Sequence, residues 1–107
     1  MTDSPIDFNG LDSAVYGPVR LGVLTALQTD GALDFTTLKK RLDVADGALG
    51  LHLRKLEEIQ YVSCRKTFVG RRPKSTYKIS ATGRRALKTY LGAMQQLIDS
   101  LDRGMNR

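Results

Sequence analysis

The sequence has very few of the residues that build metal centres and disulfides. Among its 107 residues there is one cysteine, Cys64, and one histidine, His52. One cysteine cannot form an intramolecular disulfide, and the two residues together are too few for a structural zinc site. Each is better explained by packing, His52 on the apolar face of a helix and Cys64 in a half-buried strand. Catalytic Ser/His/Asp sets, glycine-rich phosphate loops and paired carboxylates are also missing, so we expect no metal, no cofactor and no enzymatic activity.

Long apolar stretches are missing too. No run approaches the roughly 20 residues that a helix needs to cross a bilayer. The opening segment, MTDSPIDFNG, does not have the basic and then apolar pattern of a signal peptide. The length fits one domain with a modest core. These features predict a cytoplasmic protein that has no membrane partner.

Acidic residues are absent from a long stretch of the chain. Between Ile59 and Ile98 there are nine lysines and arginines and no acid, whereas five aspartates and only one arginine precede Thr36. The formal net charge is +6. Solubility is usually achieved with interspersed charges, and a field of one sign is costly in self-repulsion, so a merely solvated basic surface is the weaker interpretation. The segregation favours a polyanionic partner, with nucleic acid ahead of a membrane surface.

The apolar residues of the first half of the chain recur at helical spacing. They predict a first helix over residues 18–29, a second over 36–42 and a third over 46–59. Asp34 or Thr36 is a suitable N-cap for the second helix. Because only a short link separates the second and third helices, they must cross at a steep angle, which is the geometry of a helix-turn-helix.

The third predicted helix divides into two faces. Its buried stripe has three-and-four spacing and comprises Leu49, His52, Leu53, Leu56 and Ile59. The opposite surface, which would face a DNA groove, comprises Asp46, Gly47, Ala48, Gly50, Leu51, Arg54 and Lys55. From that surface only Arg54, or Lys55 in a different rotation, can donate charged hydrogen bonds to base edges, whereas Leu51 and Ala48 suit thymine methyl groups.

Beyond the third helix the apolar period changes from helical to alternating. Residues 61–68 and 74–80 are predicted to form antiparallel strands, joined by an arginine-rich turn over 69–73. Gly70 can adopt a positive φ, and Pro73 cannot donate to a ladder. A two-stranded ribbon is marginally stable alone, so it must pack on the helices. The residues predicted to make that contact are Val62, Tyr77 and Ile79.

A last helix is predicted from about Gly83 to Leu101, with Ser80 or Thr82 as its cap. Its apolar residues repeat as in a coiled-coil seam and are Leu87, Tyr90, Leu91, Met94, Leu97, Ile98 and Leu101. The helix either packs back on its own domain or pairs with a second copy. We favour homodimerisation, because a helix projecting past a small domain would otherwise expose a large apolar patch.

Three runs of residues resemble known proteins when they are taken in this order. PVRLGVLTAL, DFTTLKKRLDVADGALGLHLRKLEEIQYVSCRK and FVGRRPKSTYKISATGRRAL resemble the compact winged-helix transcriptional regulators of bacteria and archaea related to the ArsR and MarR types. The resemblance covers about residues 18–91. It implies an α+β, mostly α fold: a winged helix-turn-helix with a two- or three-stranded antiparallel wing and a C-terminal dimerisation helix. We expect a flexible or partly docked arm over 1–10, a DNA-binding domain over 11–82 and the dimerisation helix over 83–103.

The resemblance implies a homodimeric transcriptional regulator of double-stranded DNA, with recognition helices in successive major grooves and wings on the backbone or minor groove. The residues that we predict to contact DNA are Lys39, Lys40, Asp46, Gly47, Ala48, Gly50, Leu51, Arg54, Lys55, Arg71, Arg72 and Lys74. The cysteine metal motif of the ArsR type is absent, so a metal response is not implied. Whether a small-molecule effector acts stays open.

The predicted groove-facing surface departs from the usual pattern. Ala45, Ala48, Gly50 and Leu51 stand where such regulators tend to have a serine or threonine cap and polar residues. We therefore expect modest direct readout, with affinity dominated by phosphate contacts and DNA shape. The same departure favours the alternative hypothesis, a winged-helix module whose basic wing binds an acidic protein partner. Gln60 stands where a glycine commonly closes the helix, which predicts a slightly strained left-handed cap.

Overall fold

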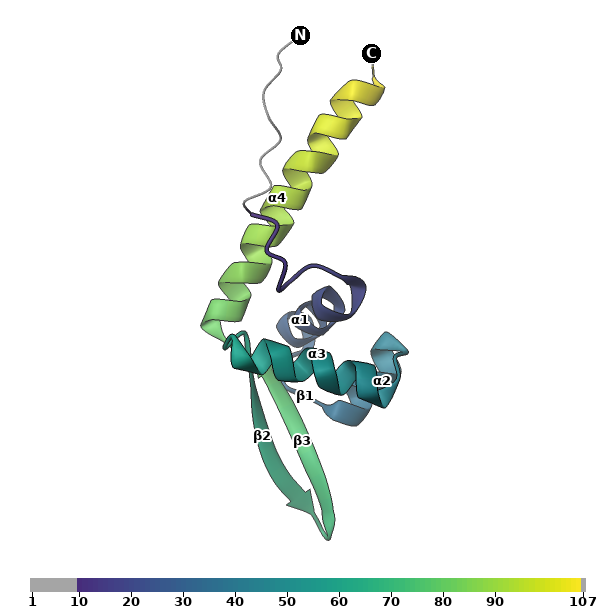
Figure 1. Cartoon of the computed structure of the whole chain (residues 1–107), viewed down its shortest axis with the longest axis vertical. Helices are drawn as coiled ribbons and strands as arrows, with labels where there is room; N and C mark the ends of the chain where they lie inside the picture. The colour runs from purple at the N-terminus through teal and green to yellow at the C-terminus, as the bar shows by residue number, and fades with distance from the viewer. Residues whose placement is uncertain (1–9, 107) are drawn as a thin grey trace.

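The computed structural model describes residues 10–106 and shows a helical body from which a β-hairpin and a long helix extend in opposite directions (Figure 1). Its elements are α1 (Pro18–Asp30), β1 (Leu33–Asp34), α2 (Phe35–Leu42), α3 (Asp46–Glu58), β2 (Val62–Val69), β3 (Arg72–Ile79) and α4 (Ala81–Met105). The predicted fold, a mostly helical winged helix-turn-helix with a C-terminal helix, is thereby confirmed. Except for Gly10, the arm predicted over residues 1–10 lies outside the described residues.

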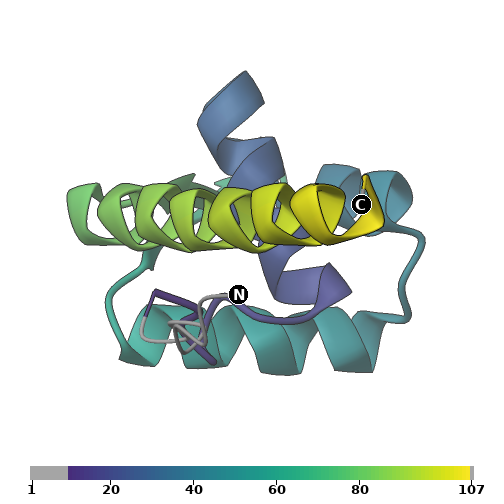
Figure 2. The same ribbon diagram turned by 90° about the horizontal axis from the view of Figure 1, so that it is seen from above.

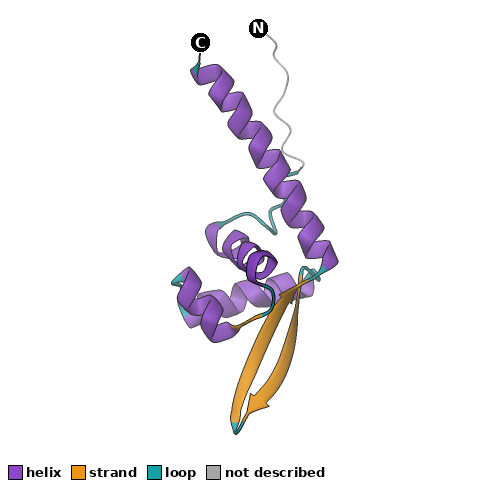
Figure 3. Ribbon diagram, turned by 180° about the vertical axis from the view of Figure 1, so that it is seen from behind, coloured by secondary structure: helices purple, strands orange, loops and turns teal. Residues whose placement is uncertain are grey.

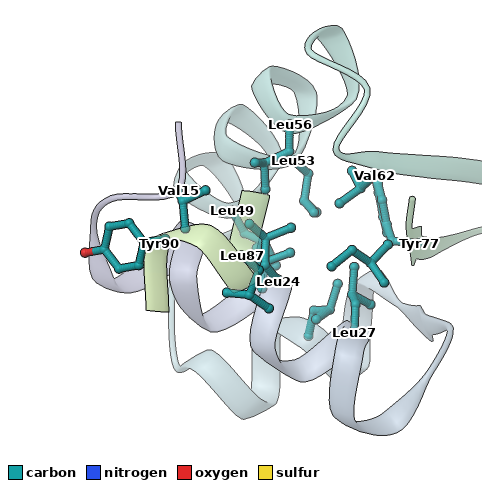
Figure 4. Close-up of a cluster of buried hydrophobic side chains, with 13 residues drawn as sticks. Val15, Leu24, Leu27, Leu49, Leu53, Leu56, Val62, Tyr77, Leu87 and Tyr90 are labelled. Atoms are coloured by element: carbon teal, nitrogen blue, oxygen red, sulfur yellow. The ribbon is translucent and has the colours of Figure 1, made fainter. Parts of the chain in front are cut away.

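The hydrophobic core lies where the three short helices, the base of the hairpin and the first half of α4 meet (Figure 4). Its buried side chains are Val15, Val23, Leu24, Leu27, Leu38, Leu49, Leu53, Leu56, Val62, Tyr77, Ile79, Leu87 and Tyr90. Viewed along the long axis of the molecule, α1 crosses behind α4, and it contacts both α3 and α4 (Figure 2). The predicted packing of the hairpin on the helices through Val62, Tyr77 and Ile79 is confirmed.

The buried stripe of α3 ends earlier than predicted. Ile59 is 42% exposed, so its assignment to the buried stripe is wrong. The physical reason is that α3 ends at Glu58 and Ile59 is its cap, with φ −90° and ψ 5°. Gln60 then adopts φ 65°, the left-handed conformation predicted for that position. The chain changes direction there to enter β2, and the side chain of Ile59 is left partly in solvent.

The wing is a three-stranded antiparallel sheet in the order β1-β3-β2 (Figure 3). The turn between β2 and β3 contains only Gly70 and Arg71, so the longer turn predicted over 69–73 is wrong. Gly70 has φ 65° at the first central position, where a type II′ turn places glycine, so two residues are enough. Pro73 lies opposite Phe68 in the ladder. Beside a two-residue turn this is a non-hydrogen-bonded pair, so the absent N–H of Pro73 does not interrupt the sheet.

The start of α4 is fastened to the segment that follows α3. Ser80 is the N-cap of α4, as predicted, and its hydroxyl oxygen accepts a hydrogen bond from Gly83 N at 2.9 Å. The same hydroxyl donates to the Gln60 carbonyl at 2.6 Å. Ser80 N donates to the Tyr61 carbonyl, also at 2.9 Å. These bonds join the two ends of the hairpin and fix the direction in which α4 leaves the body.

A short N-terminal turn closes one side of the core. The backbone carbonyl of Asp12 accepts a hydrogen bond from Val15 N at 3.0 Å, and its carboxylate accepts one from Ala14 N at 2.9 Å. The Tyr61 hydroxyl donates to the same carboxylate, and this bond raises the pKa of Tyr61 to about 12. The hydroxyl therefore stays protonated at neutral pH and keeps the turn attached, with Val15 fully buried beneath it.

Candidate nucleic-acid interface

Local caps set the positions of α2 and α3. The Asp34 carboxylate caps α2 by accepting a hydrogen bond from Thr37 N at 2.8 Å, which decides between the two predicted caps. That bond to Thr37 lowers the pKa of Asp34, so the cap remains ionised at neutral pH. At the other end of α2, Asp43 has φ 52°, and this left-handed residue turns the chain into α3. The tight link predicted between the two helices is confirmed.

The face of α3 opposite the core is open. Gly47, Ala48, Leu51, Arg54 and Lys55 are exposed. The remaining glycine of this face, Gly50, is half-buried. A Cβ atom at either glycine would meet nothing within 4 Å, so internal packing does not require glycine there. The face combines two cationic side chains with a low, largely apolar surface on which another molecule can approach the helix backbone closely.

An ion pair connects α2 to the start of α3. Lys39 Nζ lies 2.7 Å from Asp46 Oδ1, and both side chains are largely exposed. Such a pair contributes less than about 1 kcal/mol to stability. Asp46 also lies in the first turn of α3, where a carboxylate suits the positive end of the helix dipole. Of the two lysines predicted as contacts on α2, Lys39 therefore has part of its charge neutralised by Asp46.

Strand pairing separates the wing into two faces. The register aligns Val62 with Ile79 and Cys64 with Tyr77, so these residues share the face that packs on the helices. The other face carries four cations, Arg65, Arg72, Lys74 and Lys78. Within residues 62–79 there is no acidic side chain. The hairpin is thus a ribbon with one strongly cationic face.

Two of these cations were missed by sequence reasoning. Arg65 and Lys78 were not among the predicted contacts, because the sequence alone did not fix the register. A two-residue turn at Gly70 and Arg71 would have fixed it, since each strand residue then has a defined partner. Glycine as the first of two residues between alternating segments was the signal that could have revealed it.

The predicted contact residues lie in two groups. Lys39, Lys40 and the α3 face form one group on the helical body. Arg71 and Arg72 are exposed at the far tip of the hairpin (Figure 1). Lys74, nearer the base, lies 3.9 Å from Asp34 at the start of α2. The two groups are separate on this chain, so a molecule that touches both must be extended.

His52 connects α3 to α1. Its Nδ1 accepts a hydrogen bond from Arg20 Nε at 3.0 Å, as expected for a packing histidine rather than a metal ligand. Partial burial, followed by the charges of Arg20 and Lys55, lowers the pKa of His52 below its usual value of 6.5. The imidazole is therefore neutral at pH 7 and available as an acceptor. This bond holds the middle of α3 against the body.

Acidification should weaken the fold through His52. Because its folded-state pKa lies below that of the unfolded chain, the unfolded chain binds the proton first as pH falls. The contribution of neutral His52 to the free energy of unfolding is fully present above about pH 6.5 and is lost as the pH falls below that value. The free energy of unfolding should change by less than the one-proton limit of about 1.4 kcal/mol per pH unit. Urea unfolding between pH 8 and pH 5 measures it. His52→Asn, whose amide oxygen can accept from Arg20 without titrating, should show a flatter profile; parallel profiles would contradict the assignment.

The seam predicted on α4 is divided between the core and solvent. Leu87 and Tyr90 are only 4% and 3% exposed, because the first half of α4 packs on α1 and on the turn at Val15. Their assignment to a dimer interface needs correction, since they already belong to the core of the single chain. Met94 and Leu97 are half-buried. The exposed apolar residues of this helix are Leu91, Ile98, Leu101 and, beyond the predicted seam, Met105.

The projecting half of α4 offers an open apolar surface. Leu97, Leu101 and Met105 form this surface together with Ser100 and Gly104. None of the helices within residues 10–106 is both long and apolar enough to span a bilayer. The surface is continuous with the core at Met94, which packs against the buried cluster.

The helix-turn-helix, the cationic wing and the long terminal helix define a winged-helix protein of the DNA-binding class. A family model described as a winged helix DNA-binding domain matches residues 19–98. The chain therefore belongs to the winged helix DNA-binding family, and its resemblance to winged-helix transcriptional regulators is confirmed.

Similar proteins of known sequence or structure agree with this assignment. The chain is 36% identical over 84 residues to uncharacterized protein MJ0432 of Methanocaldococcus jannaschii, covering 78% of this chain and 91% of that protein. A transcriptional regulator homologue from Pyrococcus horikoshii OT3 is 31% identical with a TM-score of 0.78, and 87% of this chain covers 93% of it. YusO from Bacillus subtilis has a TM-score of 0.74 at 18% identity over 88% of this chain and 66% of its own, which is a likeness of fold alone.

Proposed function

We propose that the protein is a homodimeric transcriptional regulator that binds double-stranded DNA with α3 in the major groove and the wing on the backbone or minor groove. The observation that carries this proposal is the hairpin of the wing, whose strands β2 and β3 align Arg65, Arg72, Lys74 and Lys78 on one face and contain no acid. The carboxylate of Asp34 on β1 lies 3.9 Å from Lys74 at the base of this face and leaves the tip cationic. Arginine and lysine that neutralise phosphates release condensed counterions, which supplies most of the affinity for any duplex. An extended polyanion is also the kind of partner that can reach both the wing tip and α3.

In this proposal α3 positions the domain more than it reads bases. Arg54 is the exposed cation best suited to hydrogen-bond base edges, and Leu51, which is 51% exposed, suits a thymine methyl group. Gly47 and Gly50 lower the surface between them, so the helix can lie deep in a groove. Most of the binding energy then comes from phosphate contacts, and sequence preference comes from Arg54 and the shape of the DNA.

Fluorescence anisotropy on a pool of mixed-sequence duplexes tests the proposal. We expect binding at low salt and a log–log salt dependence with a slope of about −0.9 for each phosphate that is neutralised. Arg54→Ala should change the preference among sequences. Failure to bind any duplex at low salt would refute DNA binding.

The low and apolar surface of α3 also supports a competing hypothesis. Ala48 and Leu51 are exposed at positions where base readout would call for polar groups. An apolar α3 surface of this kind suits a protein partner, which would bind its acidic side chains to the basic wing. Pull-downs with the full chain, with and without nuclease, separate the two hypotheses. Partners that survive nuclease and depend on Arg71 and Arg72 would favour the protein-binding module, whereas partners that disappear would favour DNA.

The projecting half of α4 is proposed as the dimer interface, and Leu101 is the residue to test. Leu101 is 63% exposed and lies on the same face as Ile98 and Met105. In a two-fold dimer each substitution acts twice. Burying a leucine contributes about 1.5–3 kcal/mol, so Leu101→Asp should raise the dimer dissociation constant by at least about a hundredfold. Light scattering should report monomers at concentrations where the wild type is dimeric.

The matched control for Leu101→Asp is Gln96→Asp. At 3.6 residues per turn, Gln96 lies on the opposite face of α4 and is exposed. Gln96→Asp adds the same charge to the same half of the helix as Leu101→Asp. It should leave the dimer intact, because the charge is added on the face away from the proposed interface. If Leu101→Asp remains dimeric, the interface lies elsewhere on the chain.

A further inference from the structure

The tip of the wing exposes large apolar side chains. Phe68 is 73% exposed and Val69 is 62% exposed, while Pro73 is also exposed. Single exposed apolar residues are common on protein surfaces. Phe68 and Pro73, however, are direct partners across the ladder, in a non-hydrogen-bonded pair whose side chains lie close together. They form one apolar element at the end of the hairpin, which we call the tip pair.

The tip pair belongs to the same face of the hairpin as the residues that pack on the core. Side chains alternate along each strand, so Phe68 follows Val62 and Cys64 on this face, and Pro73 follows Tyr77 and Ile79. The hairpin projects beyond the helical body (Figure 1). Phe68 is not among the side chains that pack against the core within residues 10–106. This face of the wing therefore extends past the body and, beyond the polar pair of Lys66 and Ser75, ends in an aromatic ring that the chain itself leaves uncovered.

The surroundings of the tip pair indicate what covers it. Arg71 occupies the turn, Arg72 and Lys74 lie on the opposite face, and Lys66 is on the same face one step nearer the base. All of these side chains are cationic, so the occupant is polyanionic and has apolar surface beside its charges. Duplex DNA meets both conditions, because stacked base pairs lie between its two phosphate backbones.

The shape of the tip suits insertion. The hairpin turns through only Gly70 and Arg71, so its end is narrow. The ring of Pro73 fixes its own φ, and it supports Phe68 from across the ladder. Proteins that enter the minor groove frequently place phenylalanine or proline between base steps, which unstacks the bases and kinks the duplex. Flanking arginines suit the negative potential of that groove.

We propose that Phe68, supported by Pro73, is an apolar wedge that enters the minor groove and partly unstacks a base step, so that the protein deforms the DNA it binds. This proposal rests on the proposed function and adds a specific action of the wing on DNA. Sequence preference then comes partly from how easily a base step unstacks, with flexible pyrimidine–purine steps favoured. The modest chemistry of the α3 face is consistent with such indirect recognition.

Plasmid relaxation tests the wedge without knowledge of the target sequence. Closed circular plasmid is relaxed by topoisomerase I in the presence of the full-length protein and then deproteinised, and the change in linking number is read on agarose gels. Unstacking unwinds the duplex, so the wild type should leave negative supercoils in proportion to the protein bound. Phe68→Ala should abolish this change at equal occupancy and weaken binding about tenfold, because an aromatic ring stacked on a base is lost.

Two further variants serve as controls. Phe68→Leu keeps a side chain that can act as a wedge and should retain most of the change in linking number. Tyr16→Ala removes an aromatic ring that is nearly as exposed, at 69%, but lies just before α1 rather than on the wing, and it should behave as the wild type. Together these results would assign the deformation to the wing tip.

Three outcomes would overturn the wedge. If Phe68→Ala changes the linking number as much as the wild type at equal occupancy, the tip does not insert although DNA binding stands. If the wild type sediments with phosphatidylserine vesicles in a Phe68-dependent manner while its effect on plasmid does not depend on Phe68, the tip is a membrane contact. If anisotropy detects no binding to any duplex at low salt, the proposed function fails together with the wedge.

Discussion

Gly83→Ala should destabilise the protein by about 3 kcal/mol or more, a large part of the roughly 5–15 kcal/mol that a small domain has. A Cβ atom at this position would lie 2.1 Å from the carbonyl oxygen of Tyr61 and 2.9 Å from its carbonyl carbon. Both are backbone atoms, so no side-chain rotation can relieve the contact. The Tyr61 carbonyl also accepts the hydrogen bond from Ser80 N, and moving it would break the junction between α3, the wing and α4.

The expected loss of stability in Gly83→Ala is opposite in sign to the effect of helix propensity. Helix propensity alone favours alanine over glycine by about 1 kcal/mol inside a helix. Gly92→Ala, on the same helix and with nothing within 4 Å of its Cβ, should therefore stabilise the protein by about that amount. Urea unfolding followed by circular dichroism measures both variants. If Gly83→Ala is as stable as the wild type, the close approach of α4 to Tyr61 does not exist.

Features encoded by neighbouring residues could be predicted from the sequence. The helices and strands follow from the apolar period, and the caps at Asp34 and Ser80 follow from side chains that bond to backbone within three residues. The exposed face of α3 followed for the same reason, because burying one stripe of a helix leaves the opposite stripe in solvent. Local chemistry was enough to obtain the helix-turn-helix.

Features that depend on distant partners could not be predicted in this way. Nothing beside Gly83 in the sequence indicates that the Tyr61 backbone lies against it. The bond from the Tyr61 hydroxyl to Asp12 likewise joins residues that are far apart in the chain. In the same way, the heptad of α4 shows which residues are apolar but not what covers them, so Leu87 and Tyr90 were assigned to a partner although the core of the chain buries them. The spacing of apolar residues shows which of them share one face of a helix, but only the tertiary structure shows what packs on that face.

The wing lies between these two cases. Its strands and its cations were predicted. The predicted turn had the wrong length, however, so the prediction could not say which side chains lie on which face of the hairpin, because a shift of one residue in the strand register moves every side chain to the other face. The correct turn at Gly70 and Arg71 places Arg72 and Lys74 on the cationic face and Phe68 with Pro73 on the other. Both the proposed phosphate contacts and the proposed wedge therefore depend on the register.

Replacing Arg71 and Arg72 together by alanine should cause the largest loss of DNA affinity. Each dimer would lose four exposed charges at the tips of its wings, two from each chain. If each neutralises one phosphate, the log–log salt slope should become shallower by about 3.6, which at roughly 0.1 M salt corresponds to a thousandfold weaker complex or more. The fold should be unaffected, because both side chains are exposed and Arg72 pairs with Val69 through its backbone. Anisotropy titrations at several salt concentrations measure the affinity and the slope.

The matched control removes the same charge from another place. Lys88→Ala with Arg103→Ala takes two exposed cations from α4 and, like the wing variant, lowers the formal charge of the chain by two from +6. If net charge alone attracted the DNA, the two double variants would bind equally weakly, and a specific role for the wing would be refuted. If the wing contacts phosphates, only the double variant of Arg71 and Arg72 should lose affinity for DNA. The loss should be a similar factor on every duplex, because phosphate contacts carry no sequence information. A loss confined to some sequences would instead mean that Arg71 and Arg72 reach base edges in the minor groove.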